Sequence, residues 1–166
     1  MKKIGIVMGS DSDITIIKEA VNTLQKFGVD FDVNIVSAHR SPEKAYAYAV
    51  EAEKKYEVII AGAGGAAHLA GVIASITPLP VIGVPMPTTG LGGLDSLLST
   101  VQMPSGVPVS TMGIGKAGAI NAALLAVQIV SVANPALRQK IALYKKQLSD
   151  EVSEKDQGVR TKLGLE

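Results

Sequence analysis

Short apolar runs alternate with longer stretches of helical periodicity along most of this chain. Apolar runs bounded by Gly, Pro and Asp predict strands at residues 3–8, 31–36, 58–61 and 81–84, with a short fifth strand at 107–110. Apolar residues at helical spacing predict helices over residues 14–27, 42–54, 66–76, 94–101 and 117–133. Gly28 is placed to end the first helix as a left-handed cap.

Strands that alternate with helices are typical of a parallel sheet covered by helices on both faces. We therefore predict a three-layer α/β fold of the flavodoxin-like or Rossmann-like type, followed by a C-terminal helix. Residues 117–133 are almost entirely apolar, and Leu137, Ile141, Tyr144 and Leu148 continue as a stripe on a charged helix. We expect one domain over residues 1–166, with a loose tail from about residue 155.

Right-handed crossovers place the loops that follow the strands along one edge of the sheet, where such folds bind ligands. Three of these loops, residues 9–13, 36–41 and 62–68, carry polar or glycine-rich sequence. Both histidines of the chain, His39 and His68, fall within them. The sequence therefore predicts a single ligand site at this edge.

The loop at 36–41 combines a hydroxyl, an imidazole and a guanidinium. Arg40 can hold a phosphate or carboxylate through two parallel hydrogen bonds, and His39 can move a proton near neutral pH. A helix cap formed by Ser41 and Pro42 is the simpler explanation of this segment. The cap leaves Ser37, His39 and Arg40 unexplained, so we assign these three to the site.

The loop at 9–13 offers hydroxyls and free backbone N–H groups at the start of a helix, which suits an anion. Ser10 and Ser12 are candidates for a phosphate, and Asp13 can accept hydrogen bonds from two ribose hydroxyls. Capping by Ser10 or Asp11 is the alternative. The spacing of the carboxylates also suits Mg²⁺, but no supporting carboxylate cluster occurs elsewhere, so we predict no metal.

The loop at 62–68 lets the backbone approach a ligand closely, with Ala63, Gly64 and Gly65 as amide donors and His68 at its end. Its glycine pattern is also that of dinucleotide sites, which need an acidic residue about 20 positions later. Residues 75–94 contain no Asp or Glu, so we discount NAD. Residues 110–117 resemble a P-loop but lack its first Gly and its Ser or Thr, which argues against ATP.

Composition narrows the class of protein further. Aromatic residues make up 4% of the 166 residues and hydrophobic residues 47%, so Ala, Val, Ile and Leu must build the core. A net charge of +1 gives no electrostatic reason to expect nucleic-acid binding. The chain has no Cys, and its first apolar run stops at Gly9, too short for a signal peptide. We expect a soluble cytoplasmic protein.

Taken together, these segments resemble the PurE family of de novo purine biosynthesis. The similarity runs in order from Ile4 to about Val132. The glycine-rich third loop is similar to that of class I members, the N5-carboxyaminoimidazole ribonucleotide (N5-CAIR) mutases. The segments that carry the resemblance are Ile6–Asp13, Val36–Pro42, Ile59–Leu69, Gly93–Ser99 with Val101–Pro104, and Ile114–Ala123.

The resemblance implies a reaction in which N5-CAIR loses CO₂ in a closed pocket and is recarboxylated at C4 to give 4-carboxy-5-aminoimidazole ribonucleotide (CAIR). It implies no metal or organic cofactor, and a homo-octamer whose sites are shared between subunits. His39 would move the proton. The binding residues would be Ser10, Ser12, Ser37 and Arg40 for phosphate, Asp13 for ribose, Ala63, Gly64 and Gly65 for the carboxylate, and His68 beside them.

Two other functions are compatible with the sequence. One is direct carboxylation of aminoimidazole ribonucleotide (AIR) by CO₂. The other is a non-catalytic, flavodoxin-like nucleotide or FMN binder. The scarcity of aromatic residues to stack on a flavin counts against the second.

Overall fold

The structure is a computed structural model that describes residues 3–88 and 90–165. Its contacts divide the chain into two compact units, residues 1–130 and 131–166, where the sequence predicted one domain; residue 166 lies outside the described part. The elements are β1 (Lys3–Met8), a 3₁₀ turn η1 (Asp11–Asp13), α1 (Ile14–Phe27), β2 (Phe31–Ile35), α2 (Pro42–Lys55), β3 (Tyr56–Ala63), α3 (Leu69–Ala74), β4 (Val81–Pro85), α4 (Leu94–Val101), β5 (Ser110–Thr111), α5 (Lys116–Ser131) and α6 (Pro135–Lys162).

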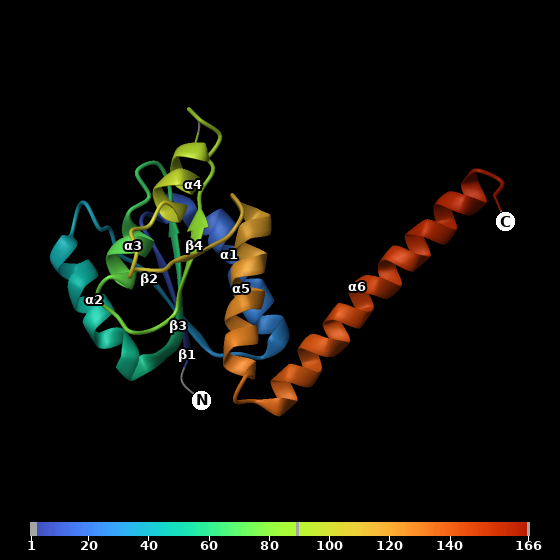
Figure 1. Cartoon of the computed structure of the whole chain (residues 1–166), viewed down its shortest axis with the longest axis horizontal. Helices are drawn as coiled ribbons and strands as arrows, with labels where there is room; N and C mark the ends of the chain where they lie inside the picture. Colours follow the sequence, from blue (N-terminus) through green and yellow to red (C-terminus); the bar gives the residue numbers. More distant parts are fainter. Residues whose placement is uncertain (1–2, 89, 166) are drawn as a thin grey trace. The chain divides into compact units, whose positions relative to one another are not determined.

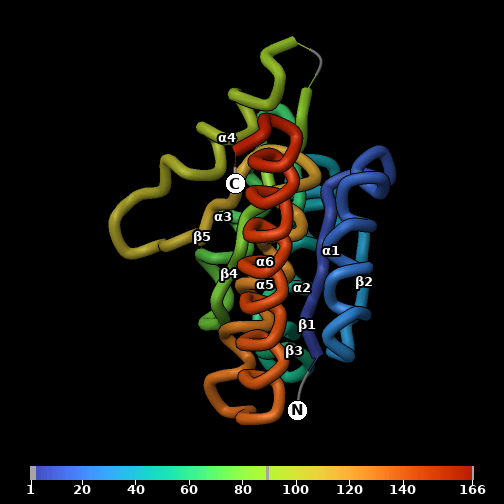
Figure 2. Tube along the Cα trace, turned by 90° about the vertical axis from the view of Figure 1, so that its right-hand side faces the viewer, coloured from blue at the N-terminus to red at the C-terminus, as the bar shows by residue number. Residues whose placement is uncertain are grey.

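The first unit is built on a five-stranded sheet in the order β2-β1-β3-β4-β5, and every neighbouring pair is parallel. Helices α1 and α5 cover one face of this sheet, and α2 and α3 cover the other (Figure 1 and Figure 2). The predicted three-layer α/β fold is confirmed. Because all strands run in one direction, the loops that follow them meet at a single edge.

Strands β1, β3 and β4 are buried on both faces, as their apolar runs predicted, whereas Val33 and Ile35 of the edge strand β2 are exposed. Ile6 and Val7 are adjacent in β1 and face opposite sides, yet neither has exposed surface. Helix α2 presents mainly small side chains to the sheet, with Ala45, Ala49 and Ala52 buried in one core cluster and Tyr48 packed against it. These small residues allow the helix to approach the strands closely.

Several boundaries differ from the prediction. Gly62 and Ala63, expected in a loop, extend β3 because they pair with β4. The third helix starts at Leu69 rather than 66. The fifth strand was predicted at 107–110 but covers only Ser110–Thr111, since Pro108 has no N–H for a ladder.

The second unit consists mainly of α6, a single helix of 28 residues (Figure 1). Asn134 caps it by accepting the N–H of Leu137 at 3.1 Å, and Pro135 occupies the first turn. The segment from about residue 155, predicted to be a loose tail, continues α6 as far as Lys162. None of the helices in the described ranges 3–88 and 90–165 is long and apolar enough to cross a membrane.

Two glycines inside helices should respond to alanine in opposite directions. A Cβ on Gly118 of α5 would overlap the carbonyl group of Gly113, whereas a Cβ on Gly158 of α6 meets nothing within 4 Å. We expect Gly118→Ala to destabilise the protein by about 3 kcal/mol or more, because backbone must move to relieve the clash. Gly158→Ala should stabilise α6 by ~0.5–1 kcal/mol through helix propensity.

Urea unfolding followed by circular dichroism measures both effects. A Gly118→Ala variant that unfolds at the same urea concentration as the parent would contradict the packing described for α5.

Candidate functional site

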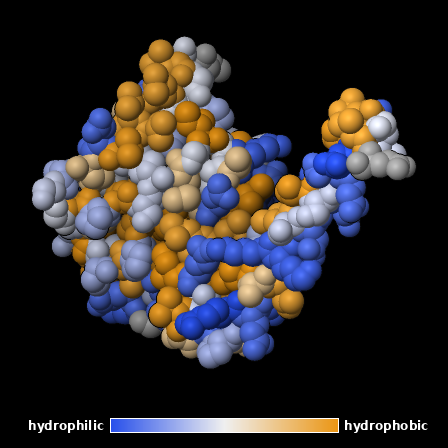
Figure 3. All heavy atoms as spheres, turned by 45° about the vertical axis from the view of Figure 1, so that its right-hand side comes forward, coloured by the Kyte–Doolittle hydropathy of each residue, from blue (hydrophilic) through white to orange (hydrophobic). Residues whose placement is uncertain are grey.

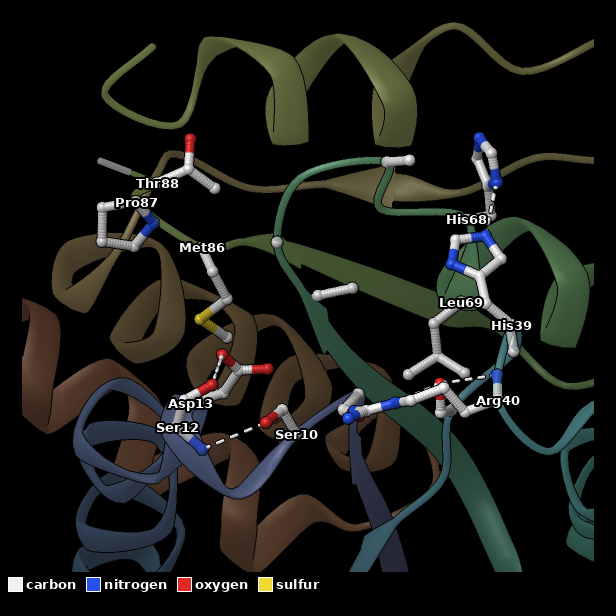
Figure 4. A pocket seen from close by; sticks show the side chains of 16 residues that line it. Ser10, Ser12, Asp13, His39, Arg40, His68, Leu69, Met86, Pro87 and Thr88 are labelled. Atoms are coloured by element: carbon white, nitrogen blue, oxygen red, sulfur yellow. Dashed lines mark hydrogen bonds between the residues drawn. The ribbon is translucent and has the colours of Figure 1, made fainter. Parts of the chain in front are cut away.

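A cleft of about 520 Å³ opens at the edge of the sheet where the strands end (Figure 4). It receives residues from the loops after β1, β2 and β3, as the sequence predicted, and also from the loop after β4. Of the ten residues assigned to the site from sequence, Gly65 alone does not line this cleft. The lining residues are Gly9, Ser10, Ser12, Asp13, Ser37, Ala38, His39, Arg40, Ala63, Gly64, Ala66, His68, Leu69, Met86, Pro87 and Thr88.

The loop after β1 is held in shape by one hydrogen bond to β3 and by others within the loop. The Gly9 N–H donates to the carbonyl of Gly62 at 3.0 Å, which fixes this loop against the third. Ser10 caps η1 by accepting the N–H of Ser12 at 3.3 Å, so the predicted capping role of Ser10 is confirmed. Capping does not exclude binding, because Ser10 and Ser12 both still line the cleft.

Asp13 is a partly buried carboxylate at the base of the cleft. Burial raises its pKa above the usual value, and the hydrogen bond from the Ser12 hydroxyl, 3.2 Å away, works in the opposite direction. Arg40 is close enough to lower the pKa slightly through its charge. A carboxylate held without a full set of donors is suited to accept hydrogen bonds from a ligand.

Arg40 joins the first two loops. Its Nη2 donates to the carbonyl of Gly9 at 2.8 Å, and its Nε lies 3.4 Å from the Ser37 hydroxyl oxygen. The same hydroxyl oxygen accepts the backbone N–H of Arg40 at 3.1 Å. Because a guanidinium has five N–H donors, this anchoring leaves others for an anion in the cleft.

The predicted cap before α2 is only partly observed. Pro42 occupies the first turn of the helix, as expected. The Ser41 hydroxyl makes no capping hydrogen bond and instead donates back to the carbonyl of Ser37 at 3.3 Å. Ser41 therefore stabilises the turn that carries His39 and Arg40.

The third loop is attached to α4. The N–H of Gly65 donates to the buried Ser96 hydroxyl at 2.9 Å. The Ser99 hydroxyl donates to the Asp95 carbonyl at 2.7 Å and also lies 3.4 Å from the Gly65 carbonyl oxygen. Gly65 has a φ of +66°, a conformation that favours glycine. Its amide is therefore used for structure, and only Ala63 and Gly64 of the three predicted amide donors line the cleft.

The two histidines meet at the side of the cleft (Figure 4). His39 Nε2 lies 2.9 Å from His68 Nδ1, and the two rings are nearly perpendicular, at 89°. The contact between the two histidines could not be predicted from the sequence, because 29 positions separate them. The pair provides one group that can accept or release a proton beside the anchored Arg40.

Sequence reasoning missed the wall contributed after β4. Met86, Pro87 and Thr88 face the loops after β1 and β2 across the cleft (Figure 4). Thr88 donates to the Asp95 carboxylate at 2.7 Å, which lowers the pKa of Asp95. The parallel topology is the signal that could have located this wall, because the loop after a fourth strand must reach the same edge.

A metal centre finds no support among the residues of the described ranges. No three His, Asp or Glu side chains in those ranges gather closely enough to bind one ion.

Comparison with known families and proteins gives consistent results. The family model described as AIR carboxylase matches residues 3–151. A Pyrococcus horikoshii protein named N5-carboxyaminoimidazole ribonucleotide mutase is 56% identical over 153 residues, which span 92% of this chain and 85% of that protein. A Mycobacterium tuberculosis protein of the same name is 55% identical over 155 residues, spanning 93% and 88% respectively.

The fold has a counterpart among solved structures. The crystal structure of Treponema denticola PurE superimposes with a TM-score of 0.85 at 26% sequence identity. The match covers 95% of this chain and 98% of that one.

The ionisation of Asp13 should reduce the stability of the ligand-free protein. Folding raises the pKa of Asp13, so the ionised carboxylate lowers the free energy of unfolding. This loss of stability is absent below the unfolded-state pKa of 3.8 and fully present above the raised pKa of the folded protein. We therefore expect Asp13→Asn to raise the midpoint of thermal unfolding at pH 7.5, by roughly 1–3 °C for a carboxylate still partly screened by solvent. The gain should shrink as the pH is lowered towards 4.

Asp11→Asn, in the same loop but exposed, is the matched control. A gain for Asp13→Asn that is equal at pH 4 and pH 7.5 would show that burial of the charge is not its cause.

Proposed function

This chain belongs to the AIR carboxylase family, and on that premise we propose that its cleft converts N5-CAIR to CAIR. The activity is that of an N5-CAIR mutase, an isomerase of de novo purine biosynthesis. The observation that carries this conclusion is identity of 53–56% with mutases from three organisms over more than nine-tenths of the chain.

The reaction requires one proton to be moved within the cleft. When the bond between N5 and the carboxylate carbon breaks, its electrons stay on nitrogen, which takes up a proton as CO₂ leaves. C4 then attacks CO₂, and the hydrogen on C4 leaves as a proton. One acid–base group that gives the first proton and accepts the second completes the cycle without any other reactant.

We assign this role to His39. Its ring stands beside the cleft next to Arg40, whose guanidinium is anchored by Gly9 and Ser37. A phosphate held by Arg40 with the hydroxyls of Ser10, Ser12 and Ser37 would fix one end of the ribonucleotide. This arrangement supports a mechanism in which the proton carrier lies close to a substrate fixed at its phosphate end.

The remaining residues complete the substrate contacts. Asp13 accepts the ribose hydroxyls, which would lower the energy of its partly buried charge. The backbone at Ala63 and Gly64 approaches the transferred carboxylate or trapped CO₂, where N–H groups would stabilise negative charge. His68 contributes to the site through its contact with the His39 ring. The residues need no metal or organic cofactor for any of these steps.

The cytoplasm is the location that suits this activity. N5-CAIR carries phosphate and carboxylate charges and does not cross membranes unaided, so its mutase is expected where the ribonucleotide is made.

Incubation with N5-CAIR is the direct test. We expect purified protein treated with a chelator, without ATP, to form CAIR as fast as untreated protein. AIR with bicarbonate, at the same concentration, should give CAIR far more slowly. Preference for AIR and bicarbonate would favour direct carboxylation, and a bound yellow chromophore with no turnover would favour a flavodoxin-like binder.

His39→Asn tests the assignment of the proton carrier. Asparagine keeps a hydrogen-bonding group but cannot titrate near neutral pH, so turnover should fall by roughly 10²-fold or more. Calorimetry with AIR should show affinity close to that of the parent. Near-normal turnover of the folded variant would remove His39 from this role.

We further propose that the protein assembles as a homo-octamer with sites near subunit contacts, as the resemblance to PurE implies. The apolar segment at 117–133 is mostly used within the chain, since α5 buries one face against the sheet unit. Exposed apolar side chains lie along α6, among them Leu143 and Val152, and also on and before α4, where Figure 3 shows hydrophobic atoms gathered. This α4 stripe consists of Leu91, Leu94, Leu98 and Val101.

If the α4 stripe forms a subunit contact, introducing negative charge into it should weaken assembly. Leu94 and Leu98 are 50% and 46% exposed, so replacing both by Glu should not disturb the core. We expect light scattering to give an octamer for the parent and a smaller species for Leu94→Glu/Leu98→Glu. Val50→Glu on α2 is the control, and a monomeric parent at micromolar concentration would refute the proposal.

A further inference from the structure

The contact between His39 and His68 constrains which nitrogen of His39 can react. A hydrogen bond between two imidazoles needs a proton on one nitrogen and a lone pair on the other. His39 uses Nε2 for this bond, 2.9 Å from His68 Nδ1. Nδ1 is therefore the nitrogen of His39 that remains for a substrate.

Both rings are supported by fixed backbone. The N–H of His68 donates to Ala66 at 2.8 Å, and its carbonyl accepts the N–H of Val72 at 2.9 Å as α3 begins. The turn that carries His39 is closed by the Ser41 N–H, which donates to the Ser37 carbonyl at 3.0 Å. The two loops thus bring the rings together without requiring the substrate.

His68 also stands between two spaces. It lines the substrate cleft and a second groove of about 430 Å³ between α3 and α4. In Figure 4 the His68 ring lies beyond His39, on the far side from Asp13 and Met86. With its Nδ1 directed to His39, its Nε2 is left for the groove.

We propose that His68 is a positioning residue for His39. It accepts the Nε2–H of His39 at its own Nδ1, which holds the His39 ring with Nδ1 towards the substrate. His39 begins the cycle as an imidazolium, and when its Nδ1–H gives the proton to N5 it becomes the Nε2–H tautomer that still donates to neutral His68. When Nδ1 then takes the proton from C4, the imidazolium is restored, so no other reactant is needed.

This inference rests on the proposed role of His39, and kinetics of paired variants separate the two. His68→Leu removes the acceptor, and we expect kcat to fall by ~10–100-fold with KM for N5-CAIR within threefold. His68→Asn places an amide oxygen near the position of Nδ1 and should recover much of that loss. Gln102→Ala, in the same second groove, is the control for changes to the groove alone.

A double variant tests whether His68 acts through His39. If it does, His39→Asn/His68→Leu should turn over no more slowly than His39→Asn alone. If His68 binds the substrate independently, the two losses should multiply. Ring ¹⁵N spectra of ligand-free protein give a second measurement, with one His39 tautomer in the parent and a mixture in His68→Leu.

Distinct results overturn distinct claims. Unchanged kcat in His68→Leu, multiplied losses in the double variant, or a defect confined to KM would each overturn the positioning role. Parent protein that does not act on N5-CAIR would instead overturn the proposed function. Active His39→Asn would remove both the proton carrier and its positioning residue.

Discussion

Close packing of small side chains is the constraint on which this structure depends. Helix α2 faces the sheet with alanines and Tyr48, and Gly5 and Gly83 lie where a Cβ would collide with neighbouring side chains. At Gly5, a Cβ would lie 2.8 Å from the hydroxyl oxygen of Tyr48 on α2. Helices that approach the strands this closely bring the ends of neighbouring loops within hydrogen-bonding distance of one another.

The site is a product of that proximity. Arg40 reaches the carbonyl of Gly9, Gly9 reaches Gly62, and His39 reaches His68, each across at least 29 positions of sequence. Every one of these contacts joins two loops rather than closing one. A ligand in the cleft therefore meets groups whose positions are already determined by the sheet.

The sequence was sufficient for the architecture because the apolar runs are short and separated by helical patterns, and those of β1, β3 and β4 are buried on both faces. Strand β1 and helix α4 have the predicted bounds, and Gly28 caps α1 in the left-handed conformation. Glycine-rich composition was misleading at Gly62, where pairing with β4 determines the conformation. Polar composition was misleading beyond residue 155, where α6 continues.

Within the site, sequence located side chains better than backbone groups. Ser10, Arg40 and His39 follow strand ends, and topology alone brings them to one edge. The use of the Gly65 amide could not be predicted, because its partner Ser96 is 31 positions away and buried. The contact between His39 and His68 could not be predicted either, since only the packed structure shows which ring nitrogens form the hydrogen bond.

The two sides of helix α4 lie in different surroundings. Ser96 and Ser99 attach the third loop from its inner side, while Leu94 and Leu98 are exposed on its outer side. Any partner seated on the outer side would thus stiffen a helix on which the cleft wall depends. If the proposed octamer seats a subunit there, dilution that separates the subunits reduces specific activity as well as mass, so catalysis and quaternary structure share one equilibrium.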